Sequence, residues 1–300
     1  MTKTRNLSYA TALMLAATAA HAEGGLQFDG TASVSYKSFS RNDDSQGQLQ
    51  FNLESDVKFS EKFSLGFDYD NSRTSSDGMT LHLTRFQLEP TLHLANGAYV
   101  GTYFQNASIS MTPIGLNIES FGVFGGYDAQ VWSIDGYIGD TSVSALGESI
   151  DSTNIGATFT VRANEKLNLY AHLAQADIVI ESRDSNIVRL SAFGADYAVQ
   201  KHLSVYGAME SISSLGDSID GIALGAAYDL AGSGLSVPGT VTIELGQGGV
   251  QDMSVNIVTV GWIIPLGNGT VKPLNSMIRT AQGGTRSPLV TAIMTYAVAN

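Results

Sequence analysis

Apolar and polar side chains alternate strictly from Gln48 to Phe59. Because successive side chains of a β-strand point to opposite sides of the sheet, this period of two predicts a strand with one apolar and one charged face. The alternation resumes after the short turn at Ser60–Lys62 and continues to Asp70. The two segments are therefore predicted to form an antiparallel hairpin with a tight turn.

The same layout recurs twice further along the chain. Alternating residues flank Arg162–Lys166 and, later, Gln200–His202, and three hairpins of one design indicate a meander. Read over the whole chain, the pattern predicts about fourteen strands, with twelve to sixteen as the range. Their expected positions are residues 27–39, 48–59, 62–72, 79–94, 98–111, 116–126, 130–139, 153–162, 166–181, 187–199, 203–213, 219–229, 236–246 and 254–265.

Short turns are expected to alternate with longer polar loops along the chain. The longer loops are predicted at Arg41–Gly47, Asn71–Gly78 and Asp140–Ser152. An even strand number with both ends on one side is the rule for bacterial outer-membrane barrels. In the fourth strand the apolar phase slips between Leu83 and Phe86, where we expect a bulge or a wrong boundary.

The second face of the strands distinguishes between two all-β architectures. A soluble β-sandwich also alternates, because it buries its apolar faces in a common core. Here the strand interiors carry Glu54, Asp56, Asp68 and Glu89 on the other face, as expected of a water-filled lumen. A closed barrel also pairs every backbone N–H and C=O group, as lipid requires. We therefore predict an all-β transmembrane antiparallel up-and-down β-barrel, with a secreted soluble β-protein as the alternative.

The first residues have the layout of a cleavable export signal. Lys3 and Arg5 precede an apolar run from Leu7 to Ala20, and a small-residue cleavage site follows before Glu23. The apolar run is about 14 residues long, shorter than the roughly 20 that a membrane-spanning helix needs. We therefore predict export to the cell outer membrane.

The end of the chain does not fit the barrel pattern. Thr270–Asn300 has mixed polarity. It is expected to hold a further strand pair, with Ser287–Ala299 as the better candidate, or to form a periplasmic tail. The predicted organisation is a signal peptide at residues 1–22, a transmembrane barrel at 23–267 and a C-terminal segment at 268–300.

Composition narrows the function classes. Cysteine is absent, which removes thiolate metal sites and disulfides, so an exported chain must rely on a large core or on a membrane. The formal net charge is -12, and it becomes -14 if Lys3 and Arg5 leave with the signal. We expect no nucleic-acid binding, which needs clustered Lys and Arg, whereas an acidic lumen would favour cations. No cofactor is expected.

Motifs of catalysis are scarce. The sequence contains no HExxH, no GxSxG and no phosphate-binding loop. Outside the signal, the histidines are His82, His93, His172 and His202, and we expect them to line the pore or its rim. A serine hydrolase with its Ser and His on neighbouring strands would escape a motif search, so it is kept as the enzymatic alternative.

Charged side chains in the lumen are the candidate functional residues. We expect them to act as an electrostatic filter, because carboxylates favour cations and opposite signs across a lumen would orient dipolar solutes. The candidate pore-lining residues are Glu54, Asp56, Lys58, Arg85, Glu89, Arg162 and Arg189.

Three segments carry turn-and-strand patterns of a known family: Gly25–Tyr36, Leu49–Asp70 and Gly194–Gly207. In these the chain resembles the Gram-negative general porins, especially the alphaproteobacterial type. The resemblance implies a barrel, often a homotrimer, that contacts outer-membrane lipid and lipopolysaccharide and lets small hydrophilic solutes diffuse. Two features depart from the family: the chain ends in Asn300 instead of an aromatic residue, and the third loop at Thr112–Gly115 is too short to fold into a lumen.

The predicted function is therefore that of a non-enzymatic porin, in which small hydrophilic solutes and ions, cations above all, diffuse through a water-filled barrel. One alternative is a structural or adhesive barrel plugged by its own side chains, and another is a barrel-wall hydrolase. A barrel of about fourteen strands is wider than the eight-stranded kind that side chains fill, which favours an open pore.

Overall fold

A computed structural model describes residues 26–41, 44–76, 79–111, 114–145, 148–179, 186–214, 217–233, 237–250, 253–267 and 276–299. The predicted signal peptide lies outside these residues.

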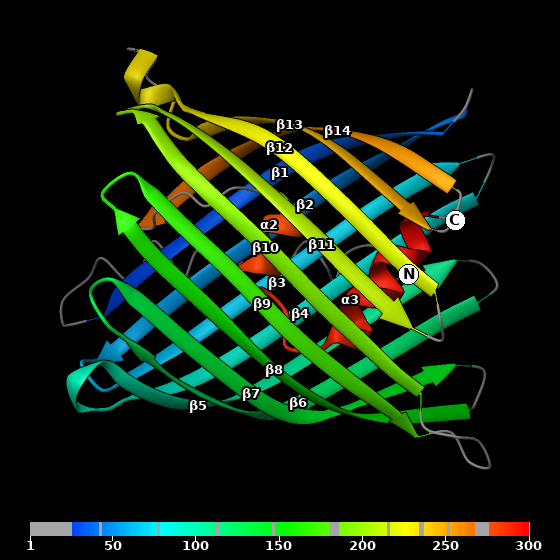
Figure 1. The fold of residues 1–300 in the computed structure, drawn as a ribbon, viewed down its shortest axis with the longest axis horizontal. Helices are drawn as coiled ribbons and strands as arrows, with labels where there is room; N and C mark the ends of the chain where they lie inside the picture. Colours follow the sequence, from blue (N-terminus) through cyan, green and yellow to red (C-terminus); the bar gives the residue numbers. More distant parts are fainter. Residues whose placement is uncertain are drawn as a thin grey trace, which may run out of the picture.

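The chain forms a closed antiparallel barrel of fourteen strands, which confirms the predicted fold class (Figure 1). Each strand pairs with its neighbours in sequence, and β1 pairs with β14 to close the ring. The strands are β1 Gln27–Arg41, β2 Asp44–Ser60, β3 Phe63–Ser76, β4 Met79–His93, β5 Ala98–Met111, β6 Ile114–Asp128, β7 Trp132–Ala145, β8 Glu148–Asn164, β9 Leu167–Val179, β10 Asn186–Gln200, β11 Leu203–Ser214, β12 Asp217–Asp229, β13 Thr240–Val250 and β14 Met253–Gly267.

Two ends of the barrel can be distinguished by the chain. At the end called terminal here, β1 begins and β14 finishes, and two short 3-10 helices, η1 Ala95–Gly97 and η2 Leu230–Ser233, lie in its connections. At the opposite or far end the predicted long loops are wrong, because backbone pairing continues to Arg41–Asp44 and to Ala145–Glu148. Backbone hydrogen bonds between strands can form in water without an apolar side-chain face. These polar residues therefore extend the strands beyond the predicted boundaries.

The outer face of the barrel is apolar and unburied. Leu224 and Leu245 remain 66% and 62% exposed, as expected of side chains that contact lipid. Aromatic side chains gather on this face near the terminal end, where Tyr127 and Trp132 have ring centroids 5.4 Å apart. The exposed aromatic residues of this band include Phe59, Phe63, Tyr127, Trp132, Phe159, Tyr197, Tyr228 and Trp262.

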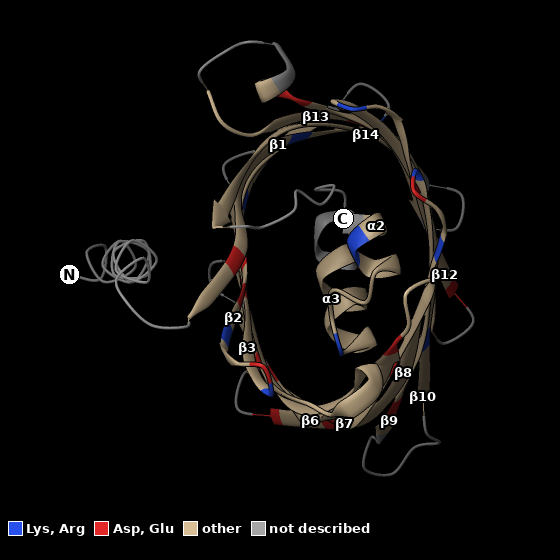
Figure 2. Cartoon of the chain, turned by 90° about the vertical axis from the view of Figure 1, so that its left-hand side faces the viewer, with Lys and Arg blue, Asp and Glu red and all other residues tan. Residues whose placement is uncertain are grey.

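The C-terminal segment forms helices inside the barrel instead of strands or a tail. Helices α2 Ser276–Ala281 and α3 Pro288–Ala299 lie within the ring of strands when the barrel is viewed end-on (Figure 2). Neither is long and apolar enough to cross a membrane. Residues 276–299 are called the plug below.

Local signals explain why the plug is helical. After α2, the Gly284 N–H donates to Arg279 O over 2.8 Å and the Gly283 N–H to Thr280 O over 2.9 Å. Gly283 has a φ of 76°, the left-handed conformation of a Schellman cap. Before α3, Ser287 Oγ accepts a 3.4 Å hydrogen bond from the Val290 N–H, and Pro288 occupies the first helical position, which suits its fixed φ.

Candidate functional site: the lumen and its plug

An arginine of the plug binds two carboxylates of the barrel wall. Arg279 of α2 donates to Asp68 Oδ2 over 2.7 Å and to Asp70 Oδ1 over 3.2 Å. Both aspartates point inward from β3, opposite Gln87 and Arg85 of β4. All three charged side chains are nearly buried, with 10–14% of the side chain exposed.

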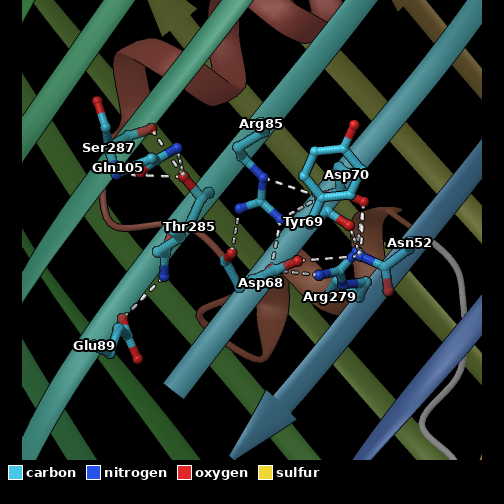
Figure 3. A network of polar contacts seen from close by, with 12 residues as sticks. Asn52, Asp68, Tyr69, Asp70, Arg85, Glu89, Gln105, Arg279, Thr285 and Ser287 are labelled. Atoms are coloured by element: carbon cyan, nitrogen blue, oxygen red, sulfur yellow. Dashed lines mark hydrogen bonds and ion pairs between the residues drawn. The ribbon is translucent and has the colours of Figure 1, made fainter. Parts of the chain in front are cut away.

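The wall supplies a second guanidinium to the same carboxylates (Figure 3). Arg85 donates to Asp68 Oδ2 over 2.8 Å and also binds Asp70. Its Nη1 donates to the carbonyl oxygen of Gly284 in the plug over 2.6 Å, and Asn52 Nδ2 donates to Asp70 Oδ1 over 2.8 Å. The cluster Asn52, Asp68, Asp70, Arg85 and Arg279, called the latch below, therefore joins plug and wall by charge-assisted hydrogen bonds.

A second plug arginine binds on the other side of the turn between the helices. Arg286 Nε donates to Glu89 Oε1 over 2.6 Å, and its Nη1 donates to Asp135. Its guanidinium carbon lies 4.0 Å from the ring centroid of Phe124, a cation–π contact. Removing one partner of a buried pair costs about 3–5 kcal/mol because the other charge stays buried and unpaired, so a docked plug without its arginines would be strongly destabilised.

The opposite wall holds α3 by apolar packing. Leu289 and Val290 belong to one buried cluster with inward-facing residues of β5–β7 and β9–β11. The wall members of this cluster are Ala107, Ile118, Val143, Ala176, Val188, Leu190 and Ile212. The expected bulge in β4 is absent, because the β3–β4 register is continuous; Leu83 instead faces the lumen, where it is 3% exposed and lines a cavity.

Small residues of β10–β12 leave room for α2. Ile278 is fully buried among Tyr206, Ala208 and Ala227. A Cβ added at Gly194 would lie 3.2 Å from Ala281 Cβ and 3.3 Å from Ile278 Cγ1. The wall and the helix therefore fit closely at Gly194.

A polar cavity of about 500 Å³ lies in the terminal part of the lumen. Its charged lining consists of six carboxylates and two plug guanidiniums: Asp29, Glu54, Asp56, Asp68, Glu89, Asp135, Arg279 and Arg286. Asp29 and Asp56 face each other across the β1–β2 ladder, and one oxygen of each is buried with no hydrogen bond among the described residues. This terminal cavity is therefore acidic.

A second cavity of about 230 Å³ lies toward the far end. Its lining is mixed, with Phe39, Ile257 and Met294 beside charged residues such as Lys37 and Glu210. Arg279 and Gly284 line both cavities. The latch therefore separates a terminal cavity from a far cavity.

Most of the seven predicted pore-lining residues lie in the lumen or at its terminal rim. Glu54 and Asp56 line the terminal cavity. Arg85 and Glu89 also face the lumen, but they bind the plug. Lys58 is exposed near the terminal rim.

Two predicted pore-lining residues do not line the lumen. Arg189 is wrong, because it is exposed on the outer face of β10 between the inward-facing Val188 and Leu190. Those two apolar residues pack on the plug and not on lipid. Alternation alone places the apolar residues of this strand on the lipid side and Arg189 in the lumen, which is the reverse. Arg162 lies at the terminal rim, where it binds Asp128 over 3.1 Å and the carbonyl oxygen of Ala129 over 2.9 Å.

Sequence reasoning missed Arg279 and Arg286, and it selected neither Asp68 nor Asp70 for the site although it placed both on the polar face. A signal for the arginines was present, because they flank Gly283-Gly284 in an acidic chain with only 16 Lys and Arg. Arginines near a helix-ending glycine pair, in a protein whose lumen is predicted to be acidic, indicate a segment of the chain that binds the inner wall of the barrel.

Metal-type clusters and Ser–His pairs can be examined among the described residues. They contain no group of three or more His, Asp and Glu side chains arranged to hold a metal ion. Ser64 Oγ and His93 Nε2 are 2.9 Å apart, yet Ser64 is only 1% exposed. Within the described part of the chain, no carboxylate contacts His93.

Comparison with known proteins shows which folds this chain resembles. No protein-family model and no curated protein matches the chain. Among solved structures, an anion-selective porin from Comamonas acidovorans matches 81% of this chain and 100% of its own, with a TM-score of 0.53 and 12% identity. A loop-deletion mutant of OmpT, an outer-membrane protein of Vibrio cholerae, matches 80% and 99% with a TM-score of 0.53 and 9% identity.

A FadL homologue of Pseudomonas aeruginosa is similar at a TM-score of 0.51 and 9% identity, over 81% of this chain and 90% of its own. The chain has the fold of outer-membrane β-barrels. At identities of 9–12% the likeness extends to the fold alone, so the resemblance to alphaproteobacterial general porins stays a prediction.

Proposed function

We propose that this protein is an outer-membrane channel whose lumen is narrowed by its own C-terminal plug, and that it passes small hydrophilic solutes and ions with a preference for cations. The observation that carries the proposal is the pair of cavities on the two sides of the latch, both lined by Arg279 and Gly284. Solutes would pass beside the plug, along strands β1–β4, which carry charged residues that bind it and are called the charged wall below.

The charge of the terminal cavity supports the cation preference. Six carboxylates face two guanidiniums there, and rings of acidic side chains select cations in other channels. Asp29 and Asp56, which oppose each other without hydrogen bonds to the described residues at one oxygen each, are suited to attract hydrated cations. Some of the carboxylates that would repel anions, Asp68, Glu89 and Asp135, also bind the arginines of the plug.

A second candidate function follows from the plug itself. Two buried arginines and an apolar helix fill part of the lumen, so a closed structural or adhesive barrel would use the same contacts. In either case the apolar outer face would contact outer-membrane lipid and lipopolysaccharide. A homotrimer remains an expectation of the porin resemblance.

Single-channel recording of the mature protein in a planar bilayer separates the two candidates. Discrete conductance steps, with a reversal potential in a salt gradient that indicates cation preference, would support the channel. A folded barrel that inserts but carries no current would support the closed barrel instead. Anion preference would contradict the role given to the terminal cavity.

A further inference from the structure

Lys37 is a buried cation that the latch does not use. It points inward from β1, is 8% exposed and lines the far cavity. No hydrogen bond or close ion pair joins it to a described residue, and the carboxylates of Glu244, Asp70 and Glu210 act on it electrostatically from further away. Because a buried ammonium group without an acceptor is costly, an anionic group of a ligand in the far cavity would stabilise it.

A hydroxyl without a partner lies beside this ammonium group. In the barrel ladder Thr259 of β14 is directly opposite Lys37 on one side and Glu244 of β13 on the other. Its Oγ1 is buried and has no hydrogen-bond partner among the described residues. Lys37 and Thr259 therefore present two donors to the same part of the cavity.

Carboxylates stand on the other side of the same row. Neighbouring strands are about 4.8 Å apart, so the backbones of Lys37 and Glu244 are separated by roughly 10 Å. Glu210 of β11 also lines the cavity. Tyr206 and Thr280 form hydrogen bonds with Glu244 and Glu210, respectively, which positions the two carboxylates at the cavity wall.

The rest of the lining combines nine apolar residues with polar ones, among them Gln48, Gln50 and the latch residues Asp70, Arg85 and Arg279. It reaches Gly249, next to the last residue of β13, and so extends toward the far end of the barrel. The volume of about 230 Å³ equals that of roughly seven or eight water molecules. The apolar lining residues are Phe39, Leu83, Ile219, Ala223, Val255, Ile257, Met277, Val290 and Met294.

We propose that the far cavity binds a small zwitterionic amino acid with an apolar side chain. Lys37 and Thr259 would bind its carboxylate, Glu244 and Glu210 its ammonium group, and the aliphatic lining its side chain. A simple cation would leave Lys37 without an acceptor, and a simple anion would meet two glutamates. Binding of this amino acid does not depend on the proposed function. Its passage through the barrel as a solute rests on that function.

Calorimetry with three matched probes tests the site. The mature protein in lipid nanodiscs is titrated with L-leucine, with 4-methylpentanoate, which lacks the amino group, and with 3-methylbutylamine, which lacks the carboxylate. We expect leucine to bind at least about tenfold more tightly than either analogue, since each loses one charged contact. Equal binding of either analogue, or no binding of leucine, would overturn the proposal.

Variants test the residues that would bind the carboxylate end of the ligand. Lys37→Met should weaken leucine about tenfold without weakening the amine, which has no carboxylate for Lys37 to bind, and Thr259→Val should weaken leucine a few-fold. Lys201→Met, which removes the same charge from an exposed turn, should change neither. An unchanged affinity for leucine in Lys37→Met would contradict the site.

Bilayer recording in parallel keeps the two proposals apart. A silent barrel that binds leucine would refute conduction and retain the site. A conducting barrel that does not bind leucine would refute the amino-acid site and leave the proposed channel function in place.

Discussion

The two halves of the lumen hold the plug by different means. Strands β1–β4 face it with charged residues, among them Asp68, Asp70, Arg85 and Glu89, whereas β9–β12 face it mainly with aliphatic and small residues. Figure 2 shows the helices between these walls. Ion pairs fix orientation through a few directional contacts, and apolar packing depends on shape over a larger surface. The terminal cavity is lined by all four strands of the charged wall, β1–β4, whereas α2 and α3 pack directly on the apolar wall, β9–β12.

The largest effect is expected from removing the ionic half of this arrangement. In Arg279→Gln with Arg286→Gln, the carboxylates of the charged wall lose both plug guanidiniums. At about 3–5 kcal/mol for each broken buried pair, the plug should leave the wall and single-channel conductance should rise several-fold. Because the chain has no cysteine, a cysteine at Thr295 reports release by its labelling rate.

The matched control for that double variant is Arg189→Gln, which removes an arginine from the outer face of β10. Conductance and labelling should stay as in the unmodified protein. If the double variant also kept the original conductance and a protected Thr295 position, the ion pairs would not be what holds the plug.

A smaller effect is expected from the apolar half. Gly194→Leu places a side chain where Ala281 and Ile278 already lie within 3.3 Å of an added Cβ. Overpacking of this kind costs about 1–3 kcal/mol, so release should be partial and cation selectivity unchanged, because no charge is altered. Ala195→Leu adds the same side chain on the lipid side and should have no effect on labelling at Thr295. Equal labelling in the two variants would show that α2 does not depend on close packing there.

The same contrast explains what the sequence could predict. Alternation was sufficient for fourteen strands because each has one apolar face, as in Gln48–Phe59. It could not show whether an apolar residue meets lipid or the plug, and Arg189 was misplaced for that reason. Alternation describes one strand at a time, whereas contact with the plug depends on the tertiary structure.

The helices of the plug were missed for a related reason. Residues 288–299 are rich in Val, Ile, Thr and Tyr, which favour strands. The caps argue for helix: Ser287-Pro288 starts α3 and Gly283-Gly284 ends α2. Packing inside the lumen overrides the strand propensity of α3, and the pairing of Arg279 with Asp68 and Asp70 joins residues more than 200 positions apart. No local pattern predicts such a contact.

A disulfide between the plug and the apolar wall sharpens the comparison. Gly194→Cys with Ala281→Cys places the two Cβ atoms about 3.2 Å apart, close to the 3.5–4.5 Å typical of disulfides. If ions pass along the charged wall with the plug in place, oxidation should leave the basal conductance unchanged. Added to Arg279→Gln and Arg286→Gln, it should suppress the several-fold rise until a reductant is supplied. A fall in basal conductance on oxidation would show that the plug must move for conduction.

The smallest effect concerns selectivity alone. Glu54→Gln with Asp56→Asn removes two carboxylates from the terminal cavity and keeps Asp68, Asp70, Glu89 and Asp135, which bind the plug arginines. Conductance steps should persist, and the cation-to-anion permeability ratio should roughly halve, because a less acidic lumen attracts fewer cations. The measurement is the reversal potential in a salt gradient at low ionic strength, where screening is weak. Glu148→Gln with Asp151→Asn, two exposed carboxylates at the far end of β8, is the control for net charge. If both double variants shifted the reversal potential equally, selectivity would follow the overall charge of the protein and not the terminal cavity.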